Sequence, residues 1–119
     1  MANSEEESTR TTAIIDFKHT VLAKFKSDLP TQQLQQLIQG LEELCSHLDF
    51  VKSFEWGTDF GQVKRQKGFT HIFVITFYGP EGLGAYVSHP LHKSYAEKFM
   101  ASIEDILILD YSPLYVKSC

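Results

Sequence analysis

The sequence has few cysteines and no long apolar run. Its two cysteines among 119 residues, Cys45 and Cys119, lack the paired spacing of a zinc or redox motif. No stretch of about 18 consecutive apolar residues predicts a membrane span, and no signal-peptide core follows Met1. We therefore expect a soluble, cytoplasmic protein of a reducing compartment, with Cys45 acting only as a core residue.

Positive charge is also scarce. Eleven Lys and Arg against fifteen Asp and Glu give a formal net charge of −4, and the basic residues form no stripe interleaved with aromatic side chains. Nucleic acid and anionic membranes are therefore not expected as partners. A chain of 119 residues that is 43% hydrophobic suits one domain with a modest core, and burying more surface in a dimer would stabilise it.

Motifs for nucleotides, nucleophilic serines and metals are missing as well. No glycine-rich loop with phosphate-binding spacing opens a helix, and no Gly-x-Ser-x-Gly turn occurs. His89 and His92 are three residues apart, but no neighbouring carboxylate or thiolate completes a ligand set, and Pro90 interrupts the helix between them. We expect neither a metal nor a cofactor.

Alternating apolar and polar residues predict strands, and stripes at three- and four-residue intervals predict helices between them. One helix starts after Pro30, a short helix carries Tyr86 and is broken at His89-Pro90, and a further helix resumes near His92. The order β-α-β-β-α-β predicts an α+β, ferredoxin-like protomer with helices on one face of a four-stranded antiparallel sheet. The predicted strands are residues 17–26, 50–56, 69–78 and 106–111, the acidic residues 1–16 are predicted to be a disordered tail, and residues 114–119 a C-terminal tail.

Histidine and tyrosine side chains gather around Pro90. Neutral imidazole accepts or gives a proton near its unperturbed pKa of about 6.5, and phenol donates a hydrogen bond to a developing oxyanion. Tyr86 and His92 are thus candidates for removing a proton beside a carbonyl, although histidines at proline-broken helix starts also serve as caps. His19 and His71 fall on the apolar faces of two strands; they are either satisfied core histidines or the floor of a cleft under the helices.

Five separated motifs resemble the plant stress-responsive dimeric α/β-barrel family. The resemblance spans about residues 17–113 and implies a homodimer in which two four-stranded sheets join into one barrel, with a pocket in each protomer. The motifs are Lys18-His19-Thr20-Val21-Leu22, Phe54-Glu55-Trp56-Gly57-Thr58-Asp59, Gly68-Phe69-Thr70-His71, Tyr86-Val87-Ser88-His89-Pro90-Leu91-His92 and Asp110-Tyr111-Ser112-Pro113.

Within that family the chain most resembles a polyketide cyclase. The resemblance implies that His92 removes the α-proton of a linear poly-β-keto substrate and that Tyr86 hydrogen-bonds the carbonyl. The cyclase carries a pocket tyrosine on its first helix where this chain has Leu41. Other family members are hydroxynitrile lyases, which cleave a cyanohydrin, or heat-stable stress proteins with no established reaction. The residues expected to bind substrate are His19, His71, Leu41, Ile38 and His89.

Overall fold

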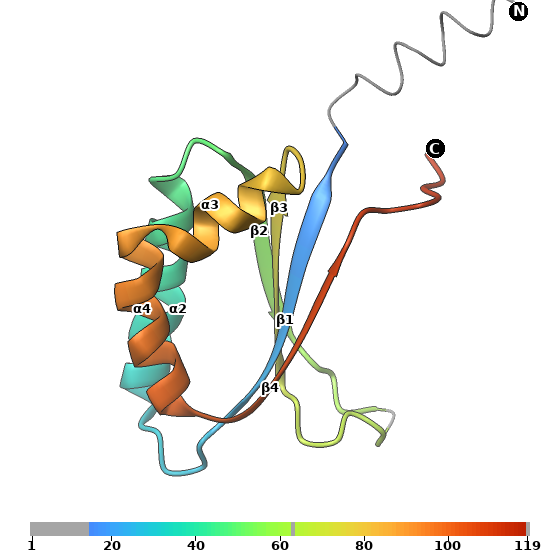
Figure 1. Ribbon diagram of the computed structural model, residues 1–119. Helices are drawn as coiled ribbons and strands as arrows, with labels where there is room; N and C mark the ends of the chain where they lie inside the picture. The colour runs from blue at the N-terminus through green and yellow to red at the C-terminus, as the bar shows by residue number, and fades with distance from the viewer. Residues whose placement is uncertain (1–14, 63, 119) are drawn as a thin grey trace, which may run out of the picture.

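A computed structural model describes residues 15–62 and 64–118 of the chain (Figure 1). It confirms the predicted order of elements and the break that divides the second helical region. The elements are β1 (Phe17–Phe25), α2 (Thr31–Ser46), β2 (Val51–Thr58), β3 (His71–Phe77), α3 (Glu81–Ser88), α4 (Pro90–Ser102) and β4 (Ile103–Tyr111).

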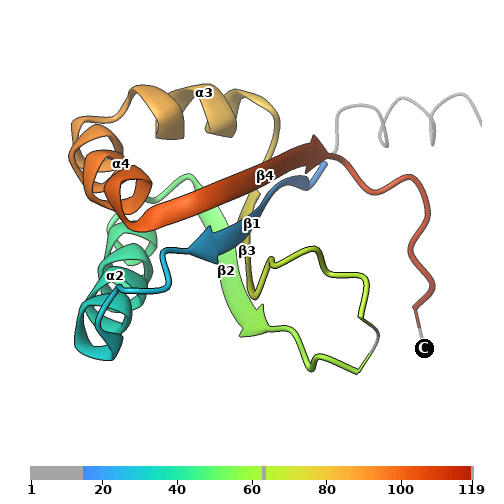
Figure 2. The same cartoon turned by 90° about the horizontal axis from the view of Figure 1, so that it is seen from below.

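The four strands form one antiparallel sheet in the order β2-β3-β1-β4. The described helices α2, α3 and α4 all cover the same face of this sheet, as Figures 1 and 2 show from two directions. This is the ferredoxin-like α+β fold expected from the sequence. Strand β4 begins directly after α4, three residues earlier than the alternation predicted. The prediction was late because Ile103 is buried under the helices and fits the apolar stripe of a helix as well as it fits a strand.

The core lies between the sheet and the helices. Inward residues of β3 are almost fully buried, with Phe73 and Ile75 each 1% exposed, because strand side chains alternate between faces and this face meets α2. The apolar stripe of α2 supplies Leu41, Leu44 and Cys45 to the same cluster. Cys45 therefore has the packing role expected for it, and burial raises the pKa of its thiol to about 12.

The opposite face of the sheet carries apolar side chains that none of the described helices covers. Ile72 of β3 and Leu107 and Leu109 of β4 are between 39% and 57% exposed. Near the start of β1, Lys18 Nζ donates to Thr76 Oγ1 of β3 over 3.0 Å. The outer face is therefore an exposed apolar surface in the single chain.

Helices α3 and α4 meet at His89. Its backbone is extended (φ −69°, ψ 135°) because a following proline disfavours the helical region. Its side-chain Nδ1 accepts a hydrogen bond from Leu91 N at 3.1 Å, so His89 caps α4. The break predicted at His89-Pro90 is confirmed.

The predicted acidic tail lies outside the described residues except for Ile15 and Asp16. Asp16 pairs with Lys52 of β2 over 2.8 Å. Residues 112–118 follow β4 without helix or strand, and Leu114 and Tyr115 are highly exposed. None of the described helices is both long and apolar enough to cross a membrane.

Candidate functional site

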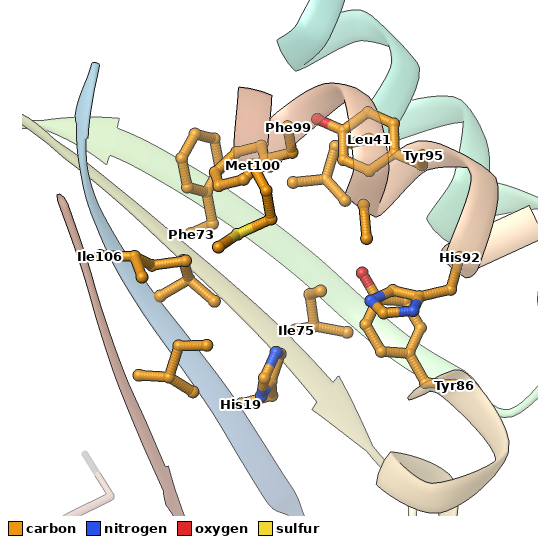
Figure 3. Close-up of a pocket in the computed structure, with 13 residues that line it drawn as sticks. His19, Leu41, Phe73, Ile75, Tyr86, His92, Tyr95, Phe99, Met100 and Ile106 are labelled. Atoms are coloured by element: carbon orange, nitrogen blue, oxygen red, sulfur yellow. The ribbon is translucent and has the colours of Figure 1, made fainter. Parts of the chain in front are cut away.

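A cavity of about 180 Å³ lies between the helix-covered face of the sheet and helices α3 and α4 (Figure 3). Its wall is apolar except for two histidines and two tyrosines. Met100 is 53% exposed and Ile108 is 45% exposed, so the cavity opens beside the edge strand β4. The lining residues are His19, Val21, Leu41, Phe73, Ile75, Tyr86, His92, Tyr95, Ala96, Phe99, Met100, Ile106 and Ile108.

Tyr86 and His92 form the polar end of this cavity. Tyr86 projects from α3 and His92 from the first turns of α4, and their ring centroids are 4.4 Å apart. The α3–α4 junction holds them together, because His92 Nδ1–H donates to the backbone oxygen of Val87 over 3.2 Å. The two residues proposed from the sequence as the acid–base pair are therefore in contact and face the same cavity.

The hydrogen bond to Val87 decides which nitrogen of His92 can act as a base. A carbonyl oxygen only accepts, so the proton of neutral His92 sits on Nδ1 and the Nε2 lone pair is free. Burial lowers the pKa of His92 below its ordinary 6.5, with the Val87 bond opposing that shift and nearby His19 adding to it. His92 is thus a neutral imidazole at pH 7.

Tyr86 is a hydrogen-bond donor rather than a base. It is 3% exposed, and burial, with smaller contributions from Cys45 and Tyr95, raises the pKa of its phenol well above the ordinary 10. The phenol therefore keeps its proton at any physiological pH. A protonated hydroxyl at the edge of an apolar cavity stabilises negative charge that develops on a substrate oxygen.

His19 reaches the cavity from the sheet and is paired with Asp110. Its Nδ1–H donates to Asp110 Oδ1 over 2.6 Å, and its ring packs edge-on against Tyr86 with centroids 5.9 Å apart. As with His92, this leaves Nε2 without a proton when the ring is neutral. Tyr86 consequently contacts both imidazoles.

Asp110 was missed as a site residue by the sequence reasoning. It stands in the Asp110-Tyr111-Ser112-Pro113 motif, but no local pattern indicates that it pairs with a residue 91 positions away. The signal that would have found it is the strand register, which places Asp110 directly opposite His19 in the β1–β4 ladder.

Tyr95 was also left out of the predicted site, although it lines the cavity. Its hydroxyl donates to the backbone oxygen of Leu37 over 2.6 Å, so it ties α4 to α2. Leu41 also lines the cavity. Because residue 41 is leucine, the wall has no tyrosine hydroxyl at this position.

The structure does not bring His71, Ile38 or His89 to this cavity. His71 lies opposite Ala23 in the β1–β3 ladder, four residues from His19 along β1, which is about 13 Å at strand spacing. The two histidines therefore do not converge. His71 instead stacks on Trp56 and contacts Thr70 Oγ1 over 2.8 Å. The two histidines do lie on the same face of the sheet, as the alternation indicated, but alternation does not say how far apart two residues lie along the strands.

Ile38 and His89 are used elsewhere. Ile38 is a buried member of the core cluster and does not line the cavity. His89 turns its ring toward Phe50, with centroids 6.4 Å apart, while its Nδ1 caps α4. Among the described residues no three His, Cys, Asp or Glu side chains gather as metal ligands do.

Comparison with known proteins places the chain in a family. Residues 17–113 match the stress responsive A/B barrel domain. The chain belongs to the stress responsive A/B barrel domain family. It is similar to a stress-response A/B barrel domain-containing protein of Arabidopsis thaliana, At5g22580, with 44% identity over 103 residues, 86% of this chain and 90% of that protein.

Another A/B barrel relative has a named reaction. Olivetolic acid cyclase of Cannabis sativa is 30% identical over 96 residues, which are 81% of this chain and 95% of the cyclase. The cyclase resemblance found in the motifs is therefore genuine but more distant than the resemblance to the Arabidopsis protein.

Solved structures show the same protomer fold. The hydroxynitrile lyase of Passiflora edulis superposes with a TM-score of 0.81 at 27% identity, covering 88% of this chain and 99% of the lyase. A protein of unknown function from Thermobifida fusca, described as dimeric and ferredoxin-like, gives 0.72 at 20% identity, covering 83% of this chain and 92% of its own. The second likeness shows the fold alone.

Proposed function

We propose that this protein is a cofactor-independent acid–base enzyme that acts on a carbonyl substrate, with aldol cyclisation of a linear poly-β-keto chain as its reaction. The observation that carries the proposal is the contact between Tyr86 and His92 at the end of an apolar cavity. His92 supplies an unprotonated Nε2, and Tyr86 supplies a phenolic proton that burial prevents from dissociating. The 30% identity with olivetolic acid cyclase supports the same chemistry.

The reaction divides between these two residues. His92 Nε2 takes the proton on the carbon between two carbonyls, while the Tyr86 hydroxyl hydrogen-bonds the carbonyl oxygen that becomes the enolate. The enolate carbon then attacks a distant carbonyl of the same chain, which forms a carbon–carbon bond and leaves an alkoxide. The imidazolium of His92 returns its proton to that alkoxide, and both residues regain their starting states.

Cyanohydrin cleavage is the second candidate, and the lining of the cavity favours it in one respect. The lining residues include no Lys, Arg or amide side chain that would hold a substrate carboxylate, and Asp110 brings a negative charge close to His19. A neutral cyanohydrin needs no cationic partner there and is not repelled by the charge of Asp110. His92 would deprotonate its hydroxyl, the carbon–carbon bond would break to leave the aldehyde and a cyanide anion, and the imidazolium of His92 would give its proton to the cyanide, which leaves as hydrogen cyanide. The likeness to the Passiflora lyase supports this reaction.

We further propose that the protein is a homodimer joined through the uncovered face of the sheet. Leu109 is 57% exposed and Ile72 is 39% exposed on that face, and Thr20, which shares it, has a buried Oγ1 without a hydrogen-bond partner in the described part of the chain. Covering the apolar side chains with a second copy would remove them from water. A solved structure with this fold is described as dimeric.

The experiment that tests the enzymatic proposal compares thermal midpoints of the wild type and His92→Ala with three ligand sets. These are β-resorcylic acids, aromatic aldehydes and a fatty-acid control. Ligand at about a hundred times its dissociation constant stabilises the protein by roughly 2.7 kcal/mol, which shifts the midpoint by several degrees. His89→Ala is the matched control, since it removes a histidine of the same motif that lies outside the cavity.

Turnover then separates the reactions. A resorcylic acid formed from a linear poly-β-keto thioester, after the aldol product loses water and water hydrolyses the thioester to release the thiol, supports the cyclase. Cyanide released from an aromatic cyanohydrin supports the lyase. His92→Ala should lower the rate by about 10²–10⁴-fold, as expected for loss of a general base. If that variant turns over like the wild type, the assignment of the base is wrong. If no ligand shifts the midpoint and neither product forms, the protein is a non-catalytic stress protein.

A further inference from the structure

Tyr95 stands between two hollows of the molecule. On one side its ring lines the apolar cavity that holds Tyr86 and His92. On the other side it lines an outer groove of about 350 Å³ between α2 and α4, together with Gln33, Gln36, Leu37, Gly40, Lys98 and Ser102. Tyr95 is the residue that these two linings share.

Two contacts hold the Tyr95 ring in this position. Its hydroxyl donates to Leu37 O over 2.6 Å, which directs it toward α2 and away from His92 (Figure 3). Its ring edge also packs against Gly40, where an added Cβ would come within 3.2 Å of Tyr95 Cε1. The absence of a side chain at Gly40 therefore lets the ring lie against the backbone of α2. Because both contacts hold the ring in place, the Tyr95 ring forms a fixed wall between the cavity and the outer groove.

The geometry points to Tyr95 as the residue that sets how long a substrate the cavity accepts. This inference rests on the proposed function, because it takes the cavity to be the substrate site. A substrate whose carbonyl lies between Tyr86 and His92 can extend its hydrocarbon part toward α2 only as far as the Tyr95 ring. Beyond the ring lies the groove between α2 and α4, whose rim carries Gln33, Gln36 and Lys98.

A series of 4-alkylbenzaldehydes, from methyl to heptyl, measures the accepted length by titration calorimetry. Each methylene that becomes buried should tighten binding by about fourfold, and the gain should stop once the chain meets Tyr95. In Tyr95→Ala the gain should continue for about two further methylenes, which is roughly 15-fold at the new optimum. Tyr95→Leu, which keeps apolar packing, is the second variant in case the alanine protein does not fold.

Tyr95→Phe is the matched control. It keeps the ring and loses only the hydrogen bond to Leu37 O, so the thermal midpoint should fall while the length optimum stays as in the wild type. A length optimum that moves in Tyr95→Phe, or stays unchanged in both Tyr95→Ala and Tyr95→Leu, would overturn the inference and leave the proposed function intact.

Crystals of the wild type and Tyr95→Ala under xenon pressure test the wall without any substrate. Dry apolar cavities take up xenon, so we expect a xenon site in the cavity of both proteins and an open connection to the groove only in the variant. If the alanine cavity stays closed toward α2, Tyr95 is not the wall. If the cavities join but no aldehyde binds either protein, the assignment of the cavity as a substrate site is wrong, and the length-setting role is overturned with it.

Discussion

His19 and Asp110 lie opposite each other in the β1–β4 ladder, with 2.6 Å between Nδ1 and Oδ1. The carboxylate fixes the His19 ring so that its Nε2 points to the cavity that Tyr86 and His92 share. The site therefore has two oriented imidazoles, one held by a carboxylate and the other by the backbone oxygen of Val87.

Replacing Asp110 by Asn should lower activity more than it lowers the stability of the fold. The amide can still accept from His19 through its oxygen, but the hydrogen bond loses its charge, which accounts for about half of its strength. We expect a stability loss of about 1 kcal/mol in urea unfolding and a fall of tenfold or more in kcat/KM. Asp105→Asn, an exposed change on the same strand, is the control. Equal kcat/KM in Asp110→Asn and wild type would show that His19 needs no carboxylate.

Tyr86→Phe should lower kcat and leave KM nearly unchanged. The phenol is a donor whose proton does not dissociate, since burial holds its pKa above the ordinary range, and a donor of this kind acts on charge that develops only in the transition state. Losing one such donor costs about 10²–10³-fold in kcat. Steady-state kinetics on the substrate identified by turnover would check this, and a rise in KM alone would mean that Tyr86 only binds substrate.

Activity should fall in acid with a midpoint below pH 6.5. Burial lowers the pKa of His92 from 6.5, and the base must be unprotonated to take a proton. A pH profile of kcat/KM measures this midpoint directly. An acid midpoint above 6.5 would contradict the assignment of a buried, neutral His92 as the base.

The same shift predicts how stability depends on pH. The unfolded chain binds a proton at His92 at a higher pH than the folded protein does, so stability is complete above about pH 6.5 and falls as the pH drops toward the folded pKa. The free energy of unfolding in urea should fall by less between pH 7.5 and pH 5.5 in His92→Gln than in the wild type. His71, whose pKa burial also lowers, adds to the loss. Substitution of the exposed His47 by Gln is the control. If His47→Gln reduced the loss of unfolding free energy as much as His92→Gln does, the prediction would be contradicted.

Two glycines of α3 should respond in opposite directions to alanine. A Cβ at Gly82 would lie 2.7 Å from Phe77 Cβ, whereas nothing lies within 4 Å of one at Gly84. Gly82→Ala should therefore push α3 off β3 and destabilise by about 1–3 kcal/mol. Gly84→Ala should stabilise by about 0.5–1 kcal/mol, because alanine is the better helix former. Thermal unfolding of both variants is sufficient, and a stable Gly82→Ala would contradict the packing.

A charge on the uncovered sheet face should prevent dimerisation. Leu109→Glu places a carboxylate in the proposed interface, whereas Leu91→Glu changes a similarly exposed leucine on the helix side. By light scattering, wild type and Leu91→Glu should have twice the 13.6 kDa chain mass, and Leu109→Glu should have the single mass. A monomeric wild type, or a dimeric Leu109→Glu, would rule out this interface.

Local sequence was sufficient for the elements of this protein, because alternation and helical spacing are properties of neighbouring residues. It predicted β1 to within one residue at its end, the long stripe of α2 and the break at His89-Pro90, where a proline restricts the residue before it. It also brought Tyr86 and His92 together correctly, since six residues across one helix junction leave little choice of geometry.

Contacts between distant segments were decided only by the tertiary structure. Asp110 joins His19 because β4 pairs with β1 in one register, and a shift of one residue would turn Asp110 to the other face. The same registers separate His71 from His19, although the two share an apolar face. Tyr95 reached the wall of the cavity because α4 crosses α2 where Gly40 leaves room for its ring. Periodicity determines which face a side chain occupies, but strand register and helix packing determine which side chains meet.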